Sequence, residues 1–367
     1  MALKKGWFKE LKQALMIPEI IAERCVHSHC EVAACVNCVE ACPQDAWLLD
    51  DDSLQINTER CDGCGLCVAA CTESALGQTL LPALKALDGK GTLLIACEKV
   101  WEEDTGEGVV PCLHAVSSRL LLEYYLNGYQ QILSCRGHCE TCPRHGGGDP
   151  FREQLARLNA LLFNRGVATI RHAQLARAAW QEKRKRLPAF TPHKGRETTT
   201  ASRRRFFQQA ITFAVEKGME QTGVIPPEND APLPWPATLP AVSHQTDKVL
   251  YPFVPEMDPS RCNGCDACVQ LCPHQALQLD KEKTGEVLAY HILASHCTGC
   301  NICSDACDQQ AIHIHHMSHQ IQAVVPLAEA ACKACGSHFH YPASHSHQPY
   351  CRICAHTNHH RKLFQVH

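Results

Sequence analysis

Hydrophobic runs and helical patterns alternate along residues 78–180. Residues 91–97 (GTLLIAC) and 129–135 (YQQILSC) are short apolar runs of the kind that form buried strands. Residues 116–128 and 151–166 have apolar positions at helical spacing, and each pattern ends at a glycine, the residue favoured just after a helix. The alternation predicts a small α/β domain with a partly parallel sheet.

The segments outside this domain show other patterns. Residues 1–24 alternate charged and apolar positions, which predicts an amphipathic segment. Residues 181–259 begin with a basic run and include nine prolines between Pro226 and Pro259, which predicts an extended linker over the surface. We find no apolar stretch of about 18 residues and no secretory apolar core at the N-terminus, so we expect a cytoplasmic protein without a membrane span.

Composition narrows the class of protein. The chain has 367 residues, of which 45% are hydrophobic, and this is enough for several folded cores. Its 35 Lys and Arg residues are balanced by 38 Asp and Glu residues, so there is no strongly basic field to hold a nucleic acid. The 26 cysteines are grouped in runs. In a chain without an export signal, dense C-x2-C spacings indicate metal binding rather than disulfides.

Two cysteine runs near the C-terminus have the spacing of iron–sulfur ligands. Residues 262–273 read CNGCDACVQLCP, and residues 297–307 read CTGCNICSDAC. In such C-x2-C-x2-C-x3-C runs, three cysteines bind one 4Fe–4S cluster and the fourth binds the neighbouring cluster. The spacing therefore predicts two clusters, one held by Cys262, Cys265, Cys268 and Cys307, and the other by Cys297, Cys300, Cys303 and Cys272.

A similar pair of runs lies near the N-terminus. Residues 61–71 read CDGCGLCVAAC, whereas the partner run is stretched over residues 25–43. The last three cysteines of the partner run keep their motif positions, but its first ligand is either Cys25 or Cys30. We favour Cys25, because the longer loop resembles an expanded variant found in multi-cluster ferredoxin-like proteins. The predicted ligand sets are Cys25 (or Cys30), Cys35, Cys38 and Cys71 for one cluster, and Cys61, Cys64, Cys67 and Cys42 for the other.

Both blocks, residues 25–77 and 260–324, resemble the two-cluster bacterial ferredoxins in these motifs. The resemblance implies a βαββαβ fold with pseudo-twofold symmetry and low-potential electron transfer. A chain that uses clusters only to staple loops needs one, whereas a conducting chain needs several. Four clusters in one protein therefore favour electron transfer over a purely structural role.

Five cysteines remain between the two blocks. The order of strand, cysteine, loop, P-C-x4-S-x-R helix, strand and cysteine cluster resembles the small iron–sulfur subunit that links a methanogen hydrogenase to heterodisulfide reductase. The resemblance implies a fifth iron–sulfur cluster, of 2Fe–2S or 4Fe–4S type, held by Cys97, Cys112, Cys135 and one of Cys139 and Cys142. The alternative is that Cys97 and Cys112 are buried as small apolar residues.

The tail, residues 325–367, has a further cysteine pattern. Its four cysteines follow C-x2-C-x15-C-x2-C, within the spacing range of a zinc ribbon. Two C-x2-C turns can close one tetrahedral site, so we expect one zinc ion that folds the tail and carries no electrons, held by Cys332, Cys335, Cys351 and Cys354. The alternative at this site is a rubredoxin-like iron.

One short motif lies in the linker. Residues 202–207 (SRRRFF) resemble a twin-arginine export signature but lie far from the N-terminus. The segment behind them is too short and polar to serve as the apolar core of an export signal. We therefore expect a basic surface segment there.

Together these patterns predict an α+β fold. It comprises two ferredoxin-like βαββαβ modules, at residues 25–77 and 260–324, and a small α/β domain at residues 78–180. An extended Pro-rich linker at residues 181–259 and a zinc ribbon at residues 325–367 complete the chain.

The expected function is electron transfer within a larger redox enzyme complex, as a subunit or accessory that meets other redox proteins. The sequence has no nucleotide-binding or nucleophilic motif, which favours a non-catalytic role, and we expect neither a nucleic acid nor a small-molecule substrate. Peripheral association with a membrane complex stays open. The alternative is a maturation or assembly factor for a metalloenzyme such as a formate dehydrogenase or hydrogenase.

Overall fold

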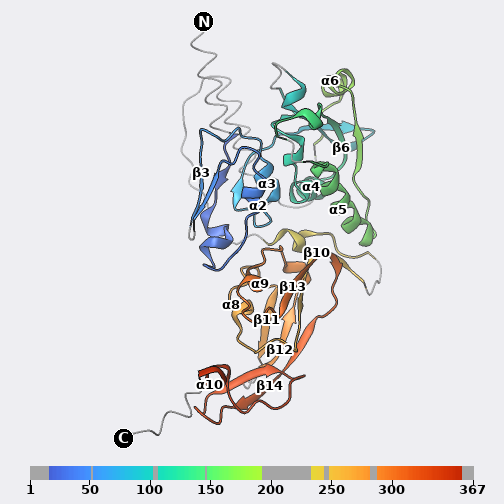
Figure 1. Ribbon diagram of the computed structural model, residues 1–367. Coiled ribbons are helices and arrows are strands. Elements are labelled where there is room, and N and C mark those ends of the chain that lie inside the picture. Colours follow the sequence, from blue (N-terminus) through green and yellow to red (C-terminus); the bar gives the residue numbers. More distant parts are fainter. Residues whose placement is uncertain are drawn as a thin grey trace, which may run out of the picture.

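The computed structural model has mixed helix and strand content, an α+β fold. The blue N-terminal part and the green central domain lie side by side, with the orange strands below them and the red tail at the far end (Figure 1). The described residues are 16–50, 53–101, 106–144, 147–191, 233–243, 248–281 and 287–357. Most of the predicted amphipathic segment and the whole SRRRFF motif lie outside them. None of the described helices is long and apolar enough to cross a membrane.

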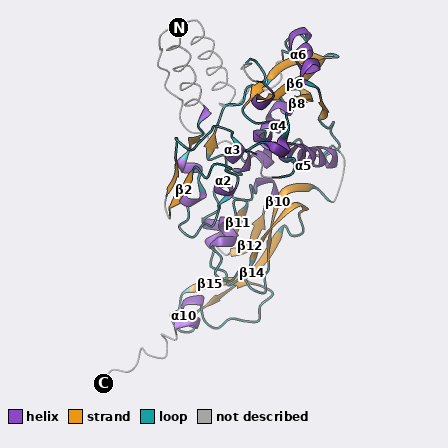
Figure 2. Ribbon diagram, turned by 45° about the horizontal axis from the view of Figure 1, so that its top comes forward, coloured by secondary structure: helices purple, strands orange, loops and turns teal. Residues whose placement is uncertain are grey.

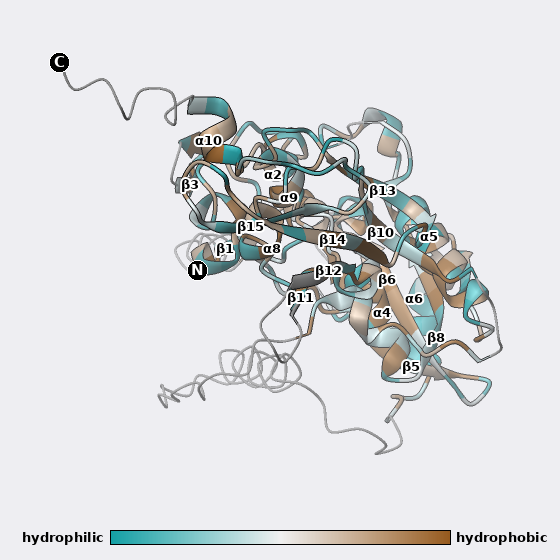
Figure 3. Cartoon of the chain, turned by 90° about the horizontal axis from the view of Figure 1, so that it is seen from below, coloured by the Kyte–Doolittle hydropathy of each residue, from teal (hydrophilic) through white to brown (hydrophobic). Residues whose placement is uncertain are grey.

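A five-stranded sheet forms the centre of the middle domain. β6 (Lys90–Cys97) pairs in parallel with β7 (Val109–Val110) and β8 (Tyr129–Cys135), and β8 pairs in parallel with β9 (Arg171–Gln174). β5 (Ala83–Leu87) adds an antiparallel edge. The apolar strands predicted from the sequence are β6, largely brown in Figure 3, and β8, and the predicted partly parallel sheet is confirmed.

Helices cover both faces of this sheet (Figure 2). α4 (Ser118–Leu126) and α5 (Pro150–Asn164) share a core with Leu93 of β6 and Ile132 of β8. Trp180 of α6 (Arg177–Arg186) packs in a second core with the next residue of each strand, Leu94 and Leu133. Because successive strand residues point to opposite faces, the two cores lie on opposite sides of one sheet. Both helices predicted from the sequence are present, and each begins at a side-chain cap, Ser117 and Asp149 respectively.

The N-terminal module consists of six short elements around the first cysteine runs. β1 pairs antiparallel with β4, and β2 pairs antiparallel with β3, so the first strand meets the last and the two middle strands form a hairpin. The elements are β1 (Glu19–Ile20), α2 (Asn37–Glu40), β2 (Trp47–Asp50), β3 (Ser53–Ile56), α3 (Leu66–Ala70) and β4 (Leu76–Gly77).

The C-terminal module repeats the same order of strand, helix, strand, strand, helix and strand. β10 pairs antiparallel with β13, and β11 pairs antiparallel with β12, as in the N-terminal module. The elements are β10 (Leu250–Met257), α8 (Ala267–Gln270), β11 (Leu277–Lys281), β12 (Val287–Ile292), α9 (Ile302–Asp305) and β13 (Ile312–His319).

The tail is attached to the C-terminal module by continuous pairing. β14 (Val324–Ala331) lies antiparallel between β12 and β15 (His338–Pro342), so the hairpin of the module is extended into a four-stranded sheet. α10 (Arg352–Thr357) follows at the end of the described chain.

The linker predicted at residues 181–259 is shorter than expected at both ends. α6 extends to Arg186, because burial of Trp180 anchors the helix to the sheet, and Ala189 then forms a bridge with Lys85 of β5. At the other end, residues 250–257 form β10 despite two prolines. A two-stranded sheet leaves each strand an open edge, where missing backbone donors are tolerated.

Candidate metal centres

In the N-terminal module, four cysteines line one small pocket. Cys61 and Cys64 lie in the loop before α3, Cys67 lies on α3, and Cys42 follows α2. Three members of the group therefore come from the second half of the module and one from the first half. We call Cys42, Cys61, Cys64 and Cys67 set A.

A second group in the same module takes three cysteines from the first half and one from the second half. Burial, followed by the charges of Cys35, Cys71 and Cys25, raises the pKa of Cys38 to about 12. This group takes three cysteines from the stretched run in the first half and one, Cys71, from the end of α3. We call Cys25, Cys35, Cys38 and Cys71 set B.

The two candidates for the first ligand of set B lie in different surroundings. Burial raises the pKa of Cys35, and the charge of Cys25 adds to this effect. Cys30 packs in an apolar cluster with Val26, Ala33 and Ile302 of α9, and Cys35 packs against the same cluster. Cys30 therefore lies in the contact between the two modules, while the charge of Cys25 acts on Cys35 and Cys38.

The C-terminal module repeats both arrangements. A small pocket is lined by the three cysteines around α8 and by Cys307, which follows α9. We call Cys262, Cys265, Cys268 and Cys307 set D. Burial raises the pKa of Cys303 well above its ordinary value, with further contributions from the charges of the neighbouring Cys297, Cys300 and Cys272. We call Cys272, Cys297, Cys300 and Cys303 set C.

A local motif recurs after the fourth cysteine of each run. The Ala46 N–H donates to the Cys42 sulfur over 3.3 Å, and an alanine four positions after Cys71, Cys272 and Cys307 does the same over 3.2–3.3 Å. The residue just before each alanine has a left-handed φ of 44–57°, which turns the chain so that the N–H faces the sulfur. These four turns are Cys42–Ala46, Cys71–Ala75, Cys272–Ala276 and Cys307–Ala311.

Each turn aims a backbone N–H at the sulfur of a crossing cysteine, a contact that suits the sulfur of a metal-bound cysteine. The sequence contains the signal as CPQDA, CTESA, CPHQA and CDQQA, a C-x3-A repeat that the analysis of cysteine spacing alone overlooked. Glycines in the ligand loops place further backbone N–H groups near sulfur. Gly264 and Gly299 adopt φ of 71° and 76°, and their N–H groups lower the pKa of Cys262 and Cys297 against the larger effect of burial.

Sets B and C lie on two sides of one buried carboxylate. Glu73, whose side chain is 7% exposed, bonds His274 across the module boundary over 2.6 Å. Its charge raises the pKa of Cys35 and of Cys300, in both cases after the larger effect of burial. The Ala34 N–H also donates to Asp305 across this boundary, over 2.9 Å. The two modules therefore meet where set B faces set C.

In the central domain, four cysteines gather at the carboxyl ends of parallel strands. Cys97 ends β6, Cys112 follows β7, Cys135 ends β8, and Cys139 begins the short helix after it. A hydrogen bond with the Cys112 thiol, opposed by burial, lowers the pKa of Cys97 to about 6. Burial raises the pKa values of Cys135 and Cys139, and the charge of Cys97 contributes to both. We call Cys97, Cys112, Cys135 and Cys139 the central set.

Cys142 lies at the other end of the short helix. Burial raises the pKa of Cys139 most. The charges of Cys97 and Cys142 make smaller contributions in the same direction. Of the two residues left open by the sequence, we take Cys139, on which the charge of Cys97 acts, as the candidate fourth ligand.

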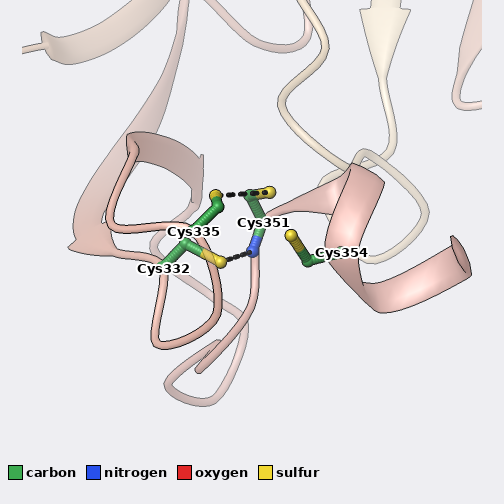
Figure 4. A group of neighbouring side chains, drawn as sticks. All are labelled: Cys332, Cys335, Cys351 and Cys354. Carbon is green, nitrogen blue, oxygen red and sulfur yellow. Dashed lines mark hydrogen bonds between the residues drawn. The ribbon is translucent and has the colours of Figure 1, made fainter. Parts of the chain in front are cut away.

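The four tail cysteines form one compact group (Figure 4). Their sulfur atoms all lie within 4.8 Å of one another, and Cys335 and Cys351 are separated by 3.9 Å between sulfurs. The N–H of Cys351 also donates to the Cys332 sulfur over 3.3 Å. A tetrahedral zinc ion with bonds of about 2.3 Å to sulfur needs sulfurs about 3.8 Å apart. The donor set and its size therefore fit zinc.

This tail packs directly on the loop of set D. His340 of β15 and Tyr290 of β12 both bond the Asp266 carboxylate, over 2.8 and 2.6 Å, and Asp266 follows Cys265. A Cβ at Gly264 would lie 2.2 Å from the His340 carbonyl oxygen, so only glycine permits this approach. The tail thus covers the loop that supplies three members of set D.

Comparison with known families agrees with the geometry of both modules. Two family models, each described as a 4Fe-4S binding domain, match residues 54–76 and 254–277. The first match contains Cys61, Cys64, Cys67 and Cys71, and the second contains Cys262, Cys265, Cys268 and Cys272. The chain therefore has two ferredoxin-type 4Fe–4S domains. No curated protein matches the chain, so the likeness of the central domain to the hydrogenase-linked subunit gains no support.

The surroundings of Cys25 and Cys30 lead to a direct prediction. Cys25→Ser is expected to lower the iron content of the anaerobically purified protein by up to about four atoms per chain, because one cubane loses a ligand. Cys30→Ser, the matched control, is expected to keep the iron content of the wild type, since Cys30 packs against apolar side chains. Iron loss from Cys30→Ser with full iron in Cys25→Ser would contradict this assignment.

Proposed function

We propose that this protein transfers electrons through a line of five iron–sulfur clusters. Sets A to D each bind one 4Fe–4S cluster, and the central set binds a fifth iron–sulfur cluster. The observation that carries the proposal is the crossing of ligands in both modules: every set takes three cysteines from one half and the fourth from the other half. This crossing, with the repeated strand and helix order, is what two-cluster ferredoxin modules require.

Contacts between the sets support their arrangement in a line. The hydrogen bond with Cys97 and then burial raise the pKa of Cys112 in the central set most, and the charge of Cys64 in set A adds a smaller contribution. Burial raises the pKa of Cys67 in set A most, and the charge of Cys38 in set B adds a smaller contribution. Glu73 lies between sets B and C, and the charge of Cys268 in set D reaches Cys303 in set C. Electrostatic influence of this kind falls steeply with distance, so neighbouring sets are close. The proposed order is central set, A, B, C and D.

Clusters in such an order exchange electrons without a chemical substrate. One cluster loses an electron as its neighbour gains one, and the protein sets each potential through burial, hydrogen bonds to sulfur and nearby charge. The two described cavities are both lined by proposed cluster ligands. We therefore propose redox proteins as partners and a role as subunit or accessory of a larger redox complex.

The domain boundaries follow from these sites. We propose a first module around sets A and B, a central domain that continues through α6, and a second module that begins with β10. The tail forms a zinc ribbon on the second module. Since zinc has no redox chemistry, the tail holds structure at the set D end of the line and carries no electrons.

Metal and sulfide analysis of anaerobically purified protein tests the proposal. We expect about 18–20 iron atoms per chain, depending on the type of the central cluster, with matching acid-labile sulfide and about one zinc. About 16 iron atoms would retain the two modules and remove the central cluster from the proposal. Only a few iron atoms without sulfide would contradict electron transfer and favour a metal-stapled scaffold.

The tail and the modules are expected to lose their metals independently. Cys354→Ser should remove the zinc and leave the iron content unchanged, because no member of sets A to D is altered. The reciprocal variant, Cys303→Ser, should lower iron by up to about four atoms and leave the zinc in place. Loss of both metals from Cys354→Ser would show that the ribbon is needed for the modules to fold.

A further inference from the structure

One buried arginine joins the ligand loops of two proposed clusters. Arg144 is 6% exposed and follows the cysteines of the central domain. Its Nε donates to the Asp62 carboxylate over 2.5 Å, and another guanidinium nitrogen donates to the Asp62 carbonyl over 3.1 Å. Asp62 lies between Cys61 and Cys64 of set A, and its other carboxylate oxygen accepts from the Cys64 N–H over 3.2 Å. The guanidinium thus holds a set A loop.

The remaining nitrogen of Arg144 holds the loops of the central set. It donates to the Glu98 carboxylate over 2.9 Å and to the Pro111 carbonyl over 2.8 Å. Glu98 follows Cys97, and Pro111 precedes Cys112. The Cys97 sulfur lies 3.7 Å from the same Pro111 carbonyl oxygen, so Arg144 and a proposed cluster ligand meet at one backbone group.

The charge of Arg144 is permanent and acts on both sites. Burial works to lower its pKa, but Asp62 and Glu98 outweigh burial and the pKa is raised, so the guanidinium stays protonated. Among the smaller contributions, this charge lowers the pKa values of Cys61 and Cys64 in set A and of Cys97 in the central set. The same group therefore favours negative charge at two neighbouring sites.

We propose that Arg144 is the residue that couples the central cluster to set A: its fork of hydrogen bonds fixes the distance between the two ligand loops, and its positive charge raises both reduction potentials. This inference rests on the proposed function. The underlying step forms and breaks no covalent bond, since one cluster is oxidised by one electron and its neighbour is reduced by one. A reduced cluster is more negative than an oxidised one, so a nearby fixed positive charge favours reduction. Sets C and D lie outside the direct contacts of Arg144.

Arg144→Gln and Arg144→Lys test this role in the full-length holoprotein. EPR-monitored titration with dithionite should show both the central and set A potentials shifted to more negative values in Arg144→Gln, with those of sets C and D unchanged. Arg144→Lys keeps the charge but loses the fork, so its potentials should stay closer to the wild type while electron transfer between the two clusters slows. Cys97→Ser and Cys61→Ser spectra assign the two signals.

Arg165→Gln is the matched control. Arg165 is also buried, at 3% exposed, but donates to the carbonyls of Leu161 and Leu250, which join α5 to β10. Its replacement should leave the central and set A potentials unchanged. Equal shifts in Arg144→Gln and Arg165→Gln, or no shift in either, would overturn the inference and leave Arg144 a purely structural residue.

Glu98→Gln should shift the central reduction potential in the opposite direction. It also tests the proposal if Arg144→Gln does not fold. It removes one negative charge beside Cys97 while Arg144 keeps its bonds to Asp62, so the central potential should become more positive. A negative shift, or none, would contradict the electrostatic role. Absence of iron from the wild-type central site is a separate outcome: it would defeat the proposed fifth cluster, and a shift confined to set A would then overturn the shared role of Arg144.

Discussion

The proposed arrangement of this protein depends on one constraint, the crossing of the fourth cysteine of each run to the ligand set of the neighbouring run. Because each set draws on both halves of its module, neither half can complete a site alone. The antiparallel pairing of β1 with β4 and of β10 with β13 brings the halves together. The recurring left-handed turn and its N–H donor to sulfur then aim each crossing cysteine. Local backbone geometry and the modular fold are therefore parts of one requirement.

The contacts between the parts of the chain also lie close to the proposed ligands. Polar side chains that hold adjacent domains together lie beside proposed ligands: Arg144 between the central domain and set A, Glu73 and His274 between the modules, and Asp266 under the tail. Removing one partner from such buried pairs leaves an uncompensated charge, so these contacts fix position strongly even where their net stabilisation is small. Each also adds fixed charge near a cluster site, which joins domain docking to redox tuning.

Much of the site could be predicted from sequence because cysteine spacing is a local signal. The runs at residues 61–71 and 262–273 indicated ligands directly, and the alternation of β6, α4 and β8 indicated the central sheet. Tertiary contacts decided what spacing left open. Cys30 packs against Ile302 of the other module, and the partners of Arg144 lie 82 and 46 positions away along the chain. The prolines of residues 250–257 favoured a linker over a strand. β10 forms there because the open edge of its two-stranded sheet tolerates them.

The central claim is that the clusters form one continuous line, and low-temperature EPR during stepwise reduction of the full-length protein tests it most directly. Adjacent reduced clusters should interact magnetically, so the account predicts broadened, coupled signals that grow as successive clusters take up electrons. Disruption of set B by Cys38→Ser should leave separate signals from the two sides of the gap. A wild-type spectrum that is a simple sum of isolated clusters, unchanged by Cys38→Ser apart from the missing component, would contradict a continuous line.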